Sequence, residues 1–438
     1  MLLLFLAFTH DPVALDKHIS TSAYSGHTPM KKRVKMKILF VAPYPISRIR
    51  IRSYGFVSQL AKAHEVTVLA LCSTLREAAD VQTLQKEGFH IIAVTDKRPG
   101  KLFRTIKALP TKKPLQVAFD ASPALRRAIQ MQLSTGQFDL MHVEFIRSLG
   151  ALPATLSIPV VWDAVDCISL LYEHGAHFSA TPMLRWIGAI EAHRTRAYER
   201  IQLSRFRQIL VTSERDRCAL LALAKDIPSS GTNCAEITVL PHGVDQEYCR
   251  PYSGKRHPET LVFSGKMSFH ANIAGVLHLV ESIMPLIWQK RPDVKLVIAG
   301  SNPPESVRRL AQDARIEVTG YVADIRPYIE QAQVAVCPLP YAVGIQNKIL
   351  EAMALGTPVV ASSHAATGLL ATAEQNLLVA DQPEAFAASV LHLLDDPDQW
   401  THLSQNGLAY IATYHNWAQI VKQLTEIYAS VLHSTKET

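Results

Sequence analysis

Short, continuous runs of apolar residues recur along the chain, separated by stretches in which apolar residues have helical spacing. A continuous run, without polar residues at every second position, is typical of a strand buried on both faces of a parallel sheet. In the first half these runs are residues 37–42, 65–71, 89–94, 140–143, 159–162 and 208–211. Their alternation with helical stretches predicts βαβ units wound into a doubly wound sheet.

The second half repeats this pattern more cleanly. Its predicted strands are residues 260–263, 294–299, 316–319, 334–339 and 358–362. Residues 246–258 are rich in Pro, Gly and charge and are the predicted linker, and residues 417–432 form a last amphipathic helix. We therefore expect an α/β chain of two Rossmann-like domains facing each other across a cleft. The expected boundaries are residues 36–245, 259–415 and, for the C-terminal helix, 416–438.

The first 35 residues do not resemble the rest. Their apolar run at residues 2–8 lacks the basic start and the length of a secretory signal, so we interpret residues 1–35 as a disordered leader. No uninterrupted apolar run approaches the roughly 20 residues of a membrane helix. Hydrophobic residues make up 48% of the chain, which is enough for two cores and excludes global disorder. We expect a soluble chain, or one peripheral to a membrane.

Cysteine use and charge narrow the class of protein further. The six cysteines are scattered without a CxxC pair, which favours buried, reduced thiols in a cytosolic protein and gives no zinc ligand set. Residues 1–210 carry 28 Lys and Arg against 15 Asp and Glu, whereas the remainder carries 17 against 23. This asymmetry suggests that the two halves face different partners.

The richest candidate site is the loop and helix at residues 338–358, where a strand ends in a Pro- and Gly-containing loop. Asn347 is a suitable N-cap, and free N–H groups at a helix start attract an anion such as a nucleotide diphosphate. Lys348 adds positive charge, and Glu351, one turn later, is placed to reach a sugar hydroxyl. The alternative is that Asn347 only caps the helix and Glu351 is a solvated carboxylate.

Two further loops follow strand ends of the same domain. Residues 264–268 read Ser-Gly-Lys-Met-Ser, and Lys266 can bind phosphate as a point charge. Residues 319–322 read Thr-Gly-Tyr-Val and can pack against a nucleobase. Ligands of open parallel sheets bind beyond the carboxyl ends of the strands, so three such loops on one rim strengthen the prediction of a nucleotide site.

These motifs resemble glycosyltransferase family 4, retaining enzymes of the two-domain GT-B fold that use sugar nucleotides without a metal. The resemblance rests on Pro-His-Gly-Val-Asp at 241–245, the turn at 265–266, Gly-Tyr-Val at 320–322 and the helix at 350–360. It extends over residues 36–432 and is more specific in the C-terminal domain. The form of residues 344–351 resembles a subgroup linked to bacterial exopolysaccharide and exosortase-associated loci.

The resemblance implies roles for matching residues. Glu351 corresponds to the second glutamate of a paired motif that holds the donor ribose, Lys266 to a contact of the donor diphosphate, and Val322 to the base-binding position. Segment 138–144 brings a polar residue to the sugar. The expected site residues are, for catalysis, His142, Glu144, Lys266 and Lys348; for the donor, Gly265, Lys266, Val322, Gly344, Asn347, Lys348, Ile349 and Glu351; and for the acceptor loops, Ser47, Arg48, Arg50, Arg52, Asp163 and Asp166.

The chain departs from the family pattern at several positions. Val343 replaces the first glutamate of the pair, Ala271 replaces a second phosphate-binding lysine, and Glu144 stands at a histidine position. Arginines replace the glycine pair of the first loop. Our hypothesis is that Lys348 and these arginines supply the missing charge.

Two acidic segments have structural alternatives. Asp396-Pro-Asp398 resembles a metal-binding DxD by its letters, but Asp and Pro in a polar turn favour a stop and a cap. Asp163 and Asp166 follow a strand and line the expected cleft, although Asp166 is as well placed to cap a helix.

The segment 97–113 contains seven cations and no acid, with Leu102, Phe103, Ile106 and Leu109 on one helical face. A basic amphipathic helix is typical of binding to an anionic membrane surface. The alternative is a surface helix whose apolar face joins the core. No nucleic-acid-binding motif accompanies the charge.

The sequence thus predicts a cytoplasmic, metal-independent, retaining glycosyltransferase without a cofactor, peripheral on the inner face of the cytoplasmic membrane. Its substrates would be a sugar nucleotide and a lipid-linked bacterial glycan. Two alternatives stay open: a non-hydrolysing sugar-nucleotide epimerase, and a non-catalytic binding partner in a polysaccharide complex, motivated by Val343. A nicotinamide dehydrogenase is disfavoured because no GxGxxG follows a strand with a suitably spaced acid.

Overall fold

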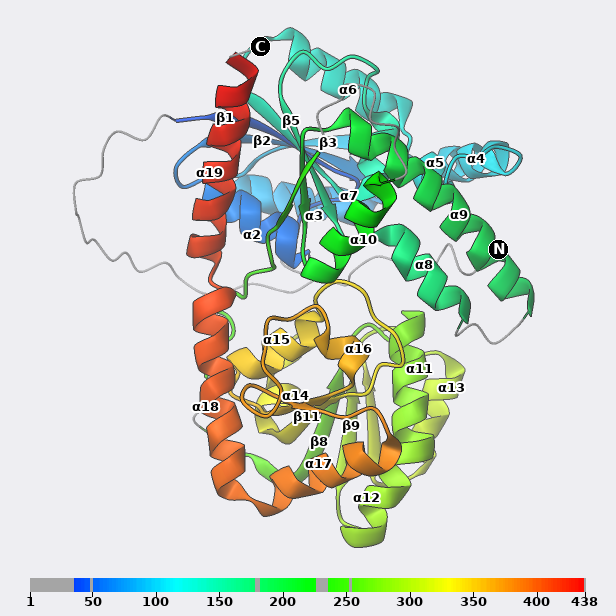
Figure 1. Cartoon of the computed structure of the whole chain (residues 1–438), viewed down its shortest axis with the longest axis vertical. Coiled ribbons are helices and arrows are strands. Elements are labelled where there is room, and N and C mark those ends of the chain that lie inside the picture. The colour runs from blue at the N-terminus through cyan, green and yellow to red at the C-terminus, as the bar shows by residue number, and fades with distance from the viewer. Residues whose placement is uncertain (1–34, 48–49, 178–181, 226–234, 252–253, 437–438) are drawn as a thin grey trace, which may run out of the picture.

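The computed structural model describes residues 35–47, 50–177, 182–225, 235–251 and 254–436. These residues form two parallel-sheet α/β domains that follow one another along the long axis of the molecule (Figure 1). The predicted fold class is therefore confirmed. Of the expected leader, residues 1–35, all but Lys35 lie outside the described residues, as does Arg48 of the first loop.

The N-terminal sheet has seven strands in the order β3-β2-β1-β4-β5-β6-β7. Its strands are β1 Lys37–Ala42, β2 Glu65–Cys72, β3 His90–Thr95, β4 Leu140–Glu144, β5 Val160–Val165, β6 Gln208–Val211 and β7 Glu236–Val239. Every pairing in the sheet is parallel. All carboxyl ends therefore point to one edge of the sheet, and the strand order reverses between β1 and β4, where open α/β sheets bind ligands.

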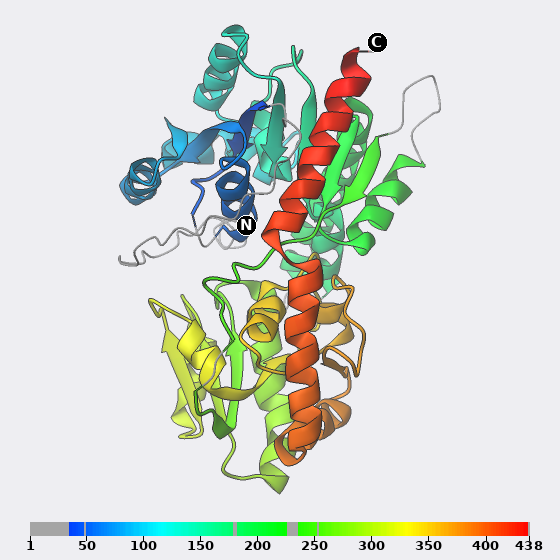
Figure 2. The ribbon, with the colours of Figure 1, turned by 90° about the vertical axis from the view of Figure 1, so that its left-hand side faces the viewer.

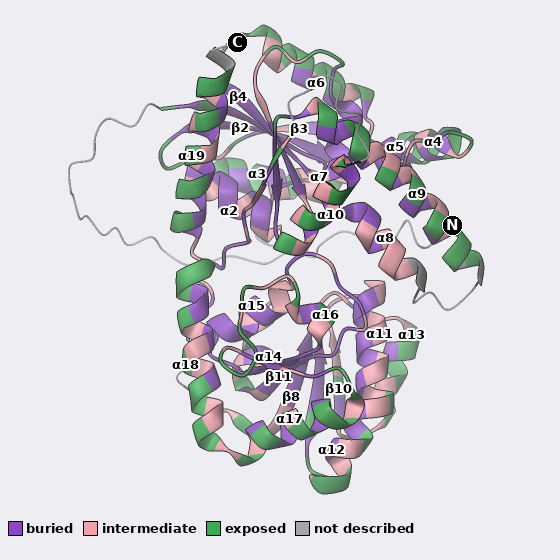
Figure 3. Cartoon of the chain, viewed as in Figure 1, coloured by how far each residue is buried: buried purple, intermediate pink, exposed green. Residues whose placement is uncertain are grey.

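Helices cover both faces of this sheet, which explains the continuous apolar runs. Alternate β1 residues face opposite ways: Phe40 packs in the core beneath α2 and α3, whereas Leu39 and Val41 pack in a second core beneath α5 to α10. The helices are α2 Ile51–Leu60, α3 Leu75–Lys86, α4 Arg98–Ala108, α5 Leu115–Phe119, α6 Pro123–Ser134, α7 Phe145–Ser148, α8 Ile168–His177, α9 Pro182–Arg205 and α10 Glu214–Ala224. Figure 3 shows the buried residues concentrated on the strands.

The C-terminal sheet has six strands in the order β10-β9-β8-β11-β12-β13. They are β8 His257–Ser264, β9 Lys295–Ala299, β10 Ile316–Gly320, β11 Ala332–Cys337, β12 Val359–Ala361 and β13 Leu378–Val379. All its pairings are parallel as well. Again the order reverses at one place, between β8 and β11, so the loops after these two strands flank the expected ligand crevice.

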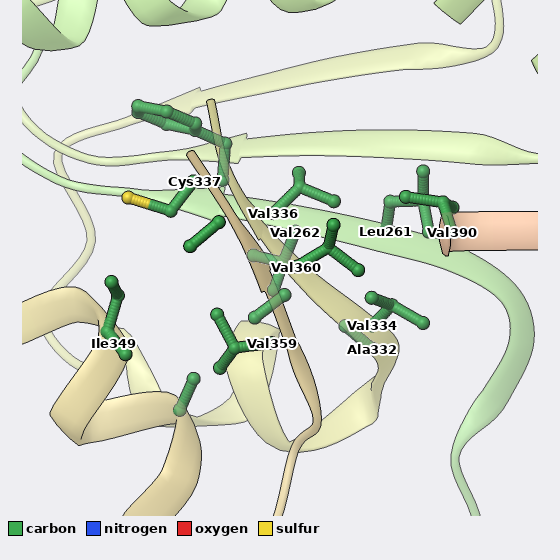
Figure 4. Packing of buried hydrophobic residues seen from close by; sticks show 14 of the residues in the cluster. Leu261, Val262, Ala332, Val334, Val336, Cys337, Ile349, Val359, Val360 and Val390 are labelled. Atoms are coloured by element: carbon green, nitrogen blue, oxygen red, sulfur yellow. The ribbon is translucent and has the colours of Figure 1, made fainter. Parts of the chain in front are cut away.

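Helices pack on this second sheet through one continuous core, part of which is seen in Figure 4. They are α11 His270–His278, α12 Met284–Lys290, α13 Glu305–Arg308, α14 Arg326–Gln331, α15 Asn347–Ala354, α16 Ser363–Ala366 and α17 Pro383–Asp395. The segment His270–Lys290 has the length and mean hydropathy of a membrane span. Val276, Leu279 and Ile283 of this segment lie in the core, so in this fold it packs on the sheet.

Two long helices connect the domains at the C-terminus. Helix α18 (Pro397–Tyr414) runs along the C-terminal domain, and α19 (Trp417–Lys436) continues onto the N-terminal domain (Figure 2). Trp417 fills a space that glycines leave open: a Cβ would lie 2.1 Å from its ring at Gly55 and 2.4 Å at Gly243. Asp396 accepts hydrogen bonds from the N–H groups of Asp398 and Gln399, which confirms the cap interpretation of the DxD-like segment.

Candidate active site

The turn after β8 forms a close-packed cradle in the C-terminal domain. Gly265 has φ 148°, and a Cβ there would lie 2.9 Å from Asn272 Nδ2 and 3.1 Å from Lys348 Nζ. Lys348 Nζ donates to Asn272 Oδ1 at 2.5 Å, while Asn272 Nδ2 donates to the carbonyl of Lys266 at 2.9 Å. The fold thus brings Lys348, predicted from one strand end, to the Gly265 turn predicted from another.

Helix α15 begins beside this turn, one residue earlier than an Asn347 cap would place it. Gln346 is the N-cap and makes no side-chain capping hydrogen bond, so Asn347 is the first helical residue and the prediction of Asn347 as N-cap is corrected. Ile349 is also corrected: its side chain is completely buried in the core (Figure 4), and its N–H bonds to the carbonyl of Gln346. It cannot contact a donor in this arrangement.

Glu351 lies one turn into α15. Burial raises the pKa of its carboxyl to about 7, an effect that the nearby Lys348 ammonium partly offsets. Burial lowers the pKa of Lys348 itself. The Glu351 carboxyl can therefore form hydrogen bonds with ligand hydroxyl groups, and the Lys348 ammonium at the helix start can bind a phosphate group. Val322 is half-buried just beyond β10, at the same sheet edge.

Across from this helix, Glu144 ends β4 of the N-terminal domain. Its carboxylate accepts hydrogen bonds from Tyr44 Oη at 2.8 Å and from Ser53 Oγ at 2.6 and 2.7 Å. Burial, reinforced by the charge of Asp163, raises the pKa of Glu144 to about 7. Glu144 is only 1% exposed, yet it lines an open pocket, so this carboxyl can exchange a hydrogen bond with a ligand near neutral pH.

The structure places His142 away from the site, which corrects its predicted catalytic role. Its side chain is completely buried and stacks on Phe40 with ring centroids 4.5 Å apart. Its Nδ1 shares a 2.8 Å hydrogen bond with Tyr428 Oη of α19, and burial lowers its pKa. His142 therefore links the sheet to the C-terminal helix.

Arg52 and Asp163 form an internal ion pair and not an acceptor contact. Arg52 Nε and Nη2 donate to the two oxygens of Asp163 at 2.7 and 2.8 Å, and Nη1 donates to the carbonyl of Leu240 at 2.8 Å. Burial opposes ionisation of Asp163, but Arg52 holds its pKa below the usual range. Arg52 therefore lines the pocket with most of its donors already engaged inside the protein.

A pocket of about 260 Å³ lies between these elements. It is lined by Tyr44, Arg50, Ile51, Arg52, Ser53, Gln116, Phe119, Glu144, Phe145, Arg147, Val165, Tyr172 and His242 of the N-terminal half, and by Asn347 of α15. Phe145 and Val165 have φ of 63° and 68°, a conformation that costs energy and is unusual for a β-branched residue. Such strain clusters at functional sites.

The two domains touch beside the pocket. Gly344 has φ 61°, and a Cβ there would lie 2.1 Å from Asp166 Oδ1. Thr212 Oγ1 donates to Asp166 Oδ1 at 3.0 Å, and burial together with the Asp216 carboxylate raises the pKa of Asp166. Asp166 does not cap α8; Glu199 of α9 does so, accepting from the N–H of Ile168 at 2.8 Å.

Sequence reasoning missed several pocket residues. Tyr44, Ser53 and Arg147 were not singled out, although Tyr44 and Arg147 follow the ends of β1 and β4, where the strand-end rule applies. Ser47 does not line the pocket; its buried Oγ has no hydrogen-bond partner. Within the described ranges, no group of three His, Cys, Asp or Glu side chains is arranged for a metal ion.

Part of the chain matches a known protein family, and parts of it resemble named enzymes. Residues 258–396 match the family model of glycosyl transferases group 1. The chain is 23% identical over 323 residues to the MMP alpha-(1->4)-mannosyltransferase of Mycolicibacterium hassiacum, a match that covers 70% of this chain and 74% of that one. It is 30% identical over 130 residues to a GDP-mannose-dependent alpha-(1-6)-phosphatidylinositol dimannoside mannosyltransferase of Mycobacterium tuberculosis, covering 29% of this chain and 34% of that one.

Solved structures share the arrangement of both domains. The sucrose-phosphate synthase of Thermosynechococcus elongatus superposes with a TM-score of 0.67 at 17% identity, covering 91% of this chain and 100% of that one. The Anabaena protein HepE in complex with UDP-glucose superposes with a TM-score of 0.61 at 16% identity, covering 90% and 100%. At these identities the likeness establishes the GT-B fold. The family match and the named relatives together identify this chain as a glycosyltransferase that carries a glycosyl transferases group 1 domain.

Proposed function

We propose that the chain transfers a hexose from a nucleoside diphosphate, held by the C-terminal domain, to a glycan acceptor held in the N-terminal pocket, with retention of anomeric configuration. The observation that carries this proposal is the pocket itself, because it joins Glu144 of one domain to Asn347 at the start of α15 in the other. A sugar leaving a diphosphate at α15 enters this pocket directly.

The leaving diphosphate needs positive charge as its bond to the sugar breaks. Lys348 at the Gly265 turn, Lys266 in that turn and the N–H groups at the start of α15 are all at hand. Charges and dipoles that are fixed beforehand are usually the largest catalytic contribution. In our proposal these groups do the work that a metal ion does in other transferases, and Glu351 binds the ribose hydroxyls.

The acceptor side of the pocket supports a hydroxyl nucleophile. Glu144 presents a carboxyl with a pKa of about 7 that can accept from an acceptor hydroxyl. We propose a bacterial surface glycan or exopolysaccharide as the acceptor, attached to a lipid. The mannosyltransferase names of two relatives support a hexose donor.

The nucleotide site can be tested by melting the full chain with UDP, GDP, dTDP or ADP. One nucleotide should stabilise the chain, by about 2.7 kcal/mol at 100 times its dissociation constant. Glu351→Ala should lose this response, because the carboxyl that faces the ribose is gone. Glu426→Ala, on α19, is the control and should keep the response. If no nucleotide stabilises the wild-type chain, the proposed donor site is wrong.

The helix α4 supports a membrane-associated acceptor. Its apolar residues Phe103 and Ile106 are 67% and 54% exposed and do not join the core, whereas Leu109 packs against a small cluster of Ala108, Leu115 and Ala118. Lys101 and Arg104 instead turn inward, to Asp120 and Asp96. Helix α9 touches the end of α4, since Arg194 Nη2 donates to the carbonyl of Leu109 at 2.6 Å. The start of α9 adds two exposed apolar side chains, Met183 and Trp186.

We expect this surface to bind vesicles that contain anionic lipid and to release them in salt, because each exposed cation contributes about 1 kcal/mol. The double variant Phe103→Ala/Ile106→Ala should sediment with such vesicles markedly less than the wild type. Leu75→Ala removes a 92% exposed apolar residue elsewhere and serves as the control. Binding that is equal with neutral vesicles, or unchanged in the double variant, would contradict a membrane role for α4.

A further inference from the structure

Two guanidinium groups lie near one aromatic ring of the pocket lining. Arg50 Cζ lies 4.1 Å from the ring centroid of Tyr44, and Arg147 Cζ lies 5.7 Å from it. Both arginines line the pocket, and the Tyr44 hydroxyl is engaged with Glu144. The two guanidinium carbons therefore lie at most about 10 Å apart, and two like charges at such a distance cost free energy unless an anion lies nearby.

The internal acids do not neutralise these two cations. Arg147 Nε lies 3.3 Å from Asp120 Oδ2, but Lys101 Nζ already donates to Asp120 Oδ1 at 2.9 Å. One carboxylate therefore serves two cations and leaves one positive charge in excess. The contact is also poor, because neither Arg147 Nε nor Asp120 Oδ2 has a hydrogen-bond partner. The side chain of Arg147 is only 10% exposed, so water solvates its charge poorly.

The positive charge of Arg50 has even less negative charge near it than that of Arg147. Across the described part of the chain, no carboxylate forms an ion pair with Arg50, whose guanidinium lies over the Tyr44 ring. The nearest pocket acid, Glu144, is held by the hydroxyls of Tyr44 and Ser53 and has a raised pKa, so it contributes at most part of a negative charge near pH 7. Gln116 lines the same pocket, and its buried Nε2 has no acceptor.

We propose that this pocket binds a phosphate group carried by the acceptor, with Arg50 and Arg147 as its ligands. The proposal rests on the proposed function, and it names the class of acceptor that the N-terminal domain takes. Guanidinium groups match phosphate oxygens in geometry and charge. A donor diphosphate has its own cations in the other domain, Lys348 and Lys266, so the arginine pair is available for a second anion. A phosphorylated sugar or a lipid diphosphate headgroup carries that chemistry.

The test is calorimetric titration of the full chain with inorganic phosphate while the donor site is saturated with the nucleotide that stabilises it. Phosphate should bind to the wild type and should bind roughly 10- to 100-fold more weakly to Arg50→Gln and Arg147→Gln, the loss expected for one charge-assisted contact. Arg127→Gln, an exposed arginine on α6, is the matched control and should bind like the wild type. Arg50→Lys keeps the charge and should recover part of the affinity.

Separate outcomes bear on the two proposals. Without nucleotide, phosphate binding that survives in Lys348→Ala but not in Arg50→Gln supports the arginine pocket. Loss in Lys348→Ala with retention in Arg50→Gln overturns it, because phosphate then occupies the donor site. Absence of phosphate binding to the wild type also overturns it.

If no nucleotide binds at all, the proposed function fails, while the phosphate titration still tests the arginine pocket. Glycerol 3-phosphate and farnesyl phosphate, bound in place of phosphate, then separate a soluble acceptor from a lipid-linked one.

Discussion

Replacing Lys348 by alanine is expected to lower kcat about 100- to 1,000-fold, the usual cost of removing one fixed donor that stabilises developing negative charge. Its ammonium is fixed by Asn272 Oδ1 at 2.5 Å and lies 4.2 Å from the Phe263 ring centroid. It also lies 3.1 Å from where a Cβ at Gly265 would be, so it faces backbone that a phosphate can approach. The measurement is steady-state transfer with the donor whose nucleotide stabilises the chain.

The control for this prediction is Lys422→Ala, an exposed lysine on α19 that changes the net charge equally. It should leave kcat within a factor of two or so of the wild type, since surface substitutions rarely matter. A melting curve for each variant separates lost chemistry from lost folding. If kcat of Lys348→Ala equals that of the control, Lys348 does not stabilise the leaving group. Another residue must then replace the phosphate-binding lysine that this chain lacks at Ala271.

The strands were predictable wherever the sheet buries them on both faces. Runs such as residues 37–42 are apolar throughout because helices cover both sides of β1. Two edge elements gave no such signal. In β7 only Ile237 of four residues is buried, and β13 has only two residues, Leu378 and Val379. Both are short strands with a single neighbour at a sheet edge, whereas the longer edge strands β3 and β10 still carry a recognisable apolar run.

The C-terminal half of the site was predictable because its signals are local. A strand end, a Gly-Lys turn and a helix start each appear within a few residues, and parallel strands then bring them to one edge. The N-terminal half depends on distant pairs. Ser53 and Glu144 are 91 residues apart, and Arg52 and Asp163 are 111 apart. No sequence spacing encodes which of two neighbouring arginines becomes buried and paired and which remains in the pocket.

His142 shows that a position near the carboxyl end of a strand does not by itself place a residue in the site. A histidine near the end of a central strand is a reasonable candidate for catalysis, and Glu144 two residues later points to the same face of the sheet. The difference arises from Tyr428, 286 residues away, whose hydroxyl bonds His142 Nδ1 as α19 returns to the N-terminal domain. Burial beneath that helix converts a candidate base into a core residue, whereas Glu144 remains at the pocket.

Replacing Gly344 by alanine should lower transfer about 100-fold, because a displacement near 1 Å between reacting groups can cost that much. The new Cβ would lie 2.1 Å from Asp166 Oδ1 and 2.8 Å from Asp166 Cγ, so the Asp166 side chain or the loop before α15 must shift, which disturbs the contact between the domains. The donor site lies within the C-terminal domain, so the stabilisation by nucleotide should persist. Transfer rate and nucleotide-dependent melting temperature are the two measurements.

Gly136→Ala is the matched control, since Gly136 has φ 63°, almost that of Gly344, but no atom lies within 4 Å of its Cβ position. Both variants carry the same backbone strain, and only Gly344→Ala disturbs the contact between domains. Asp166→Ala removes the carboxylate that the new methyl group meets. If the clash is the cause, adding Asp166→Ala to Gly344→Ala should not lower transfer further and should recover part of it, a non-additive result typical of residues in contact. Losses that simply multiply, or a Gly136→Ala variant as slow as Gly344→Ala, would show that the Gly344–Asp166 contact does not position the two domains for transfer.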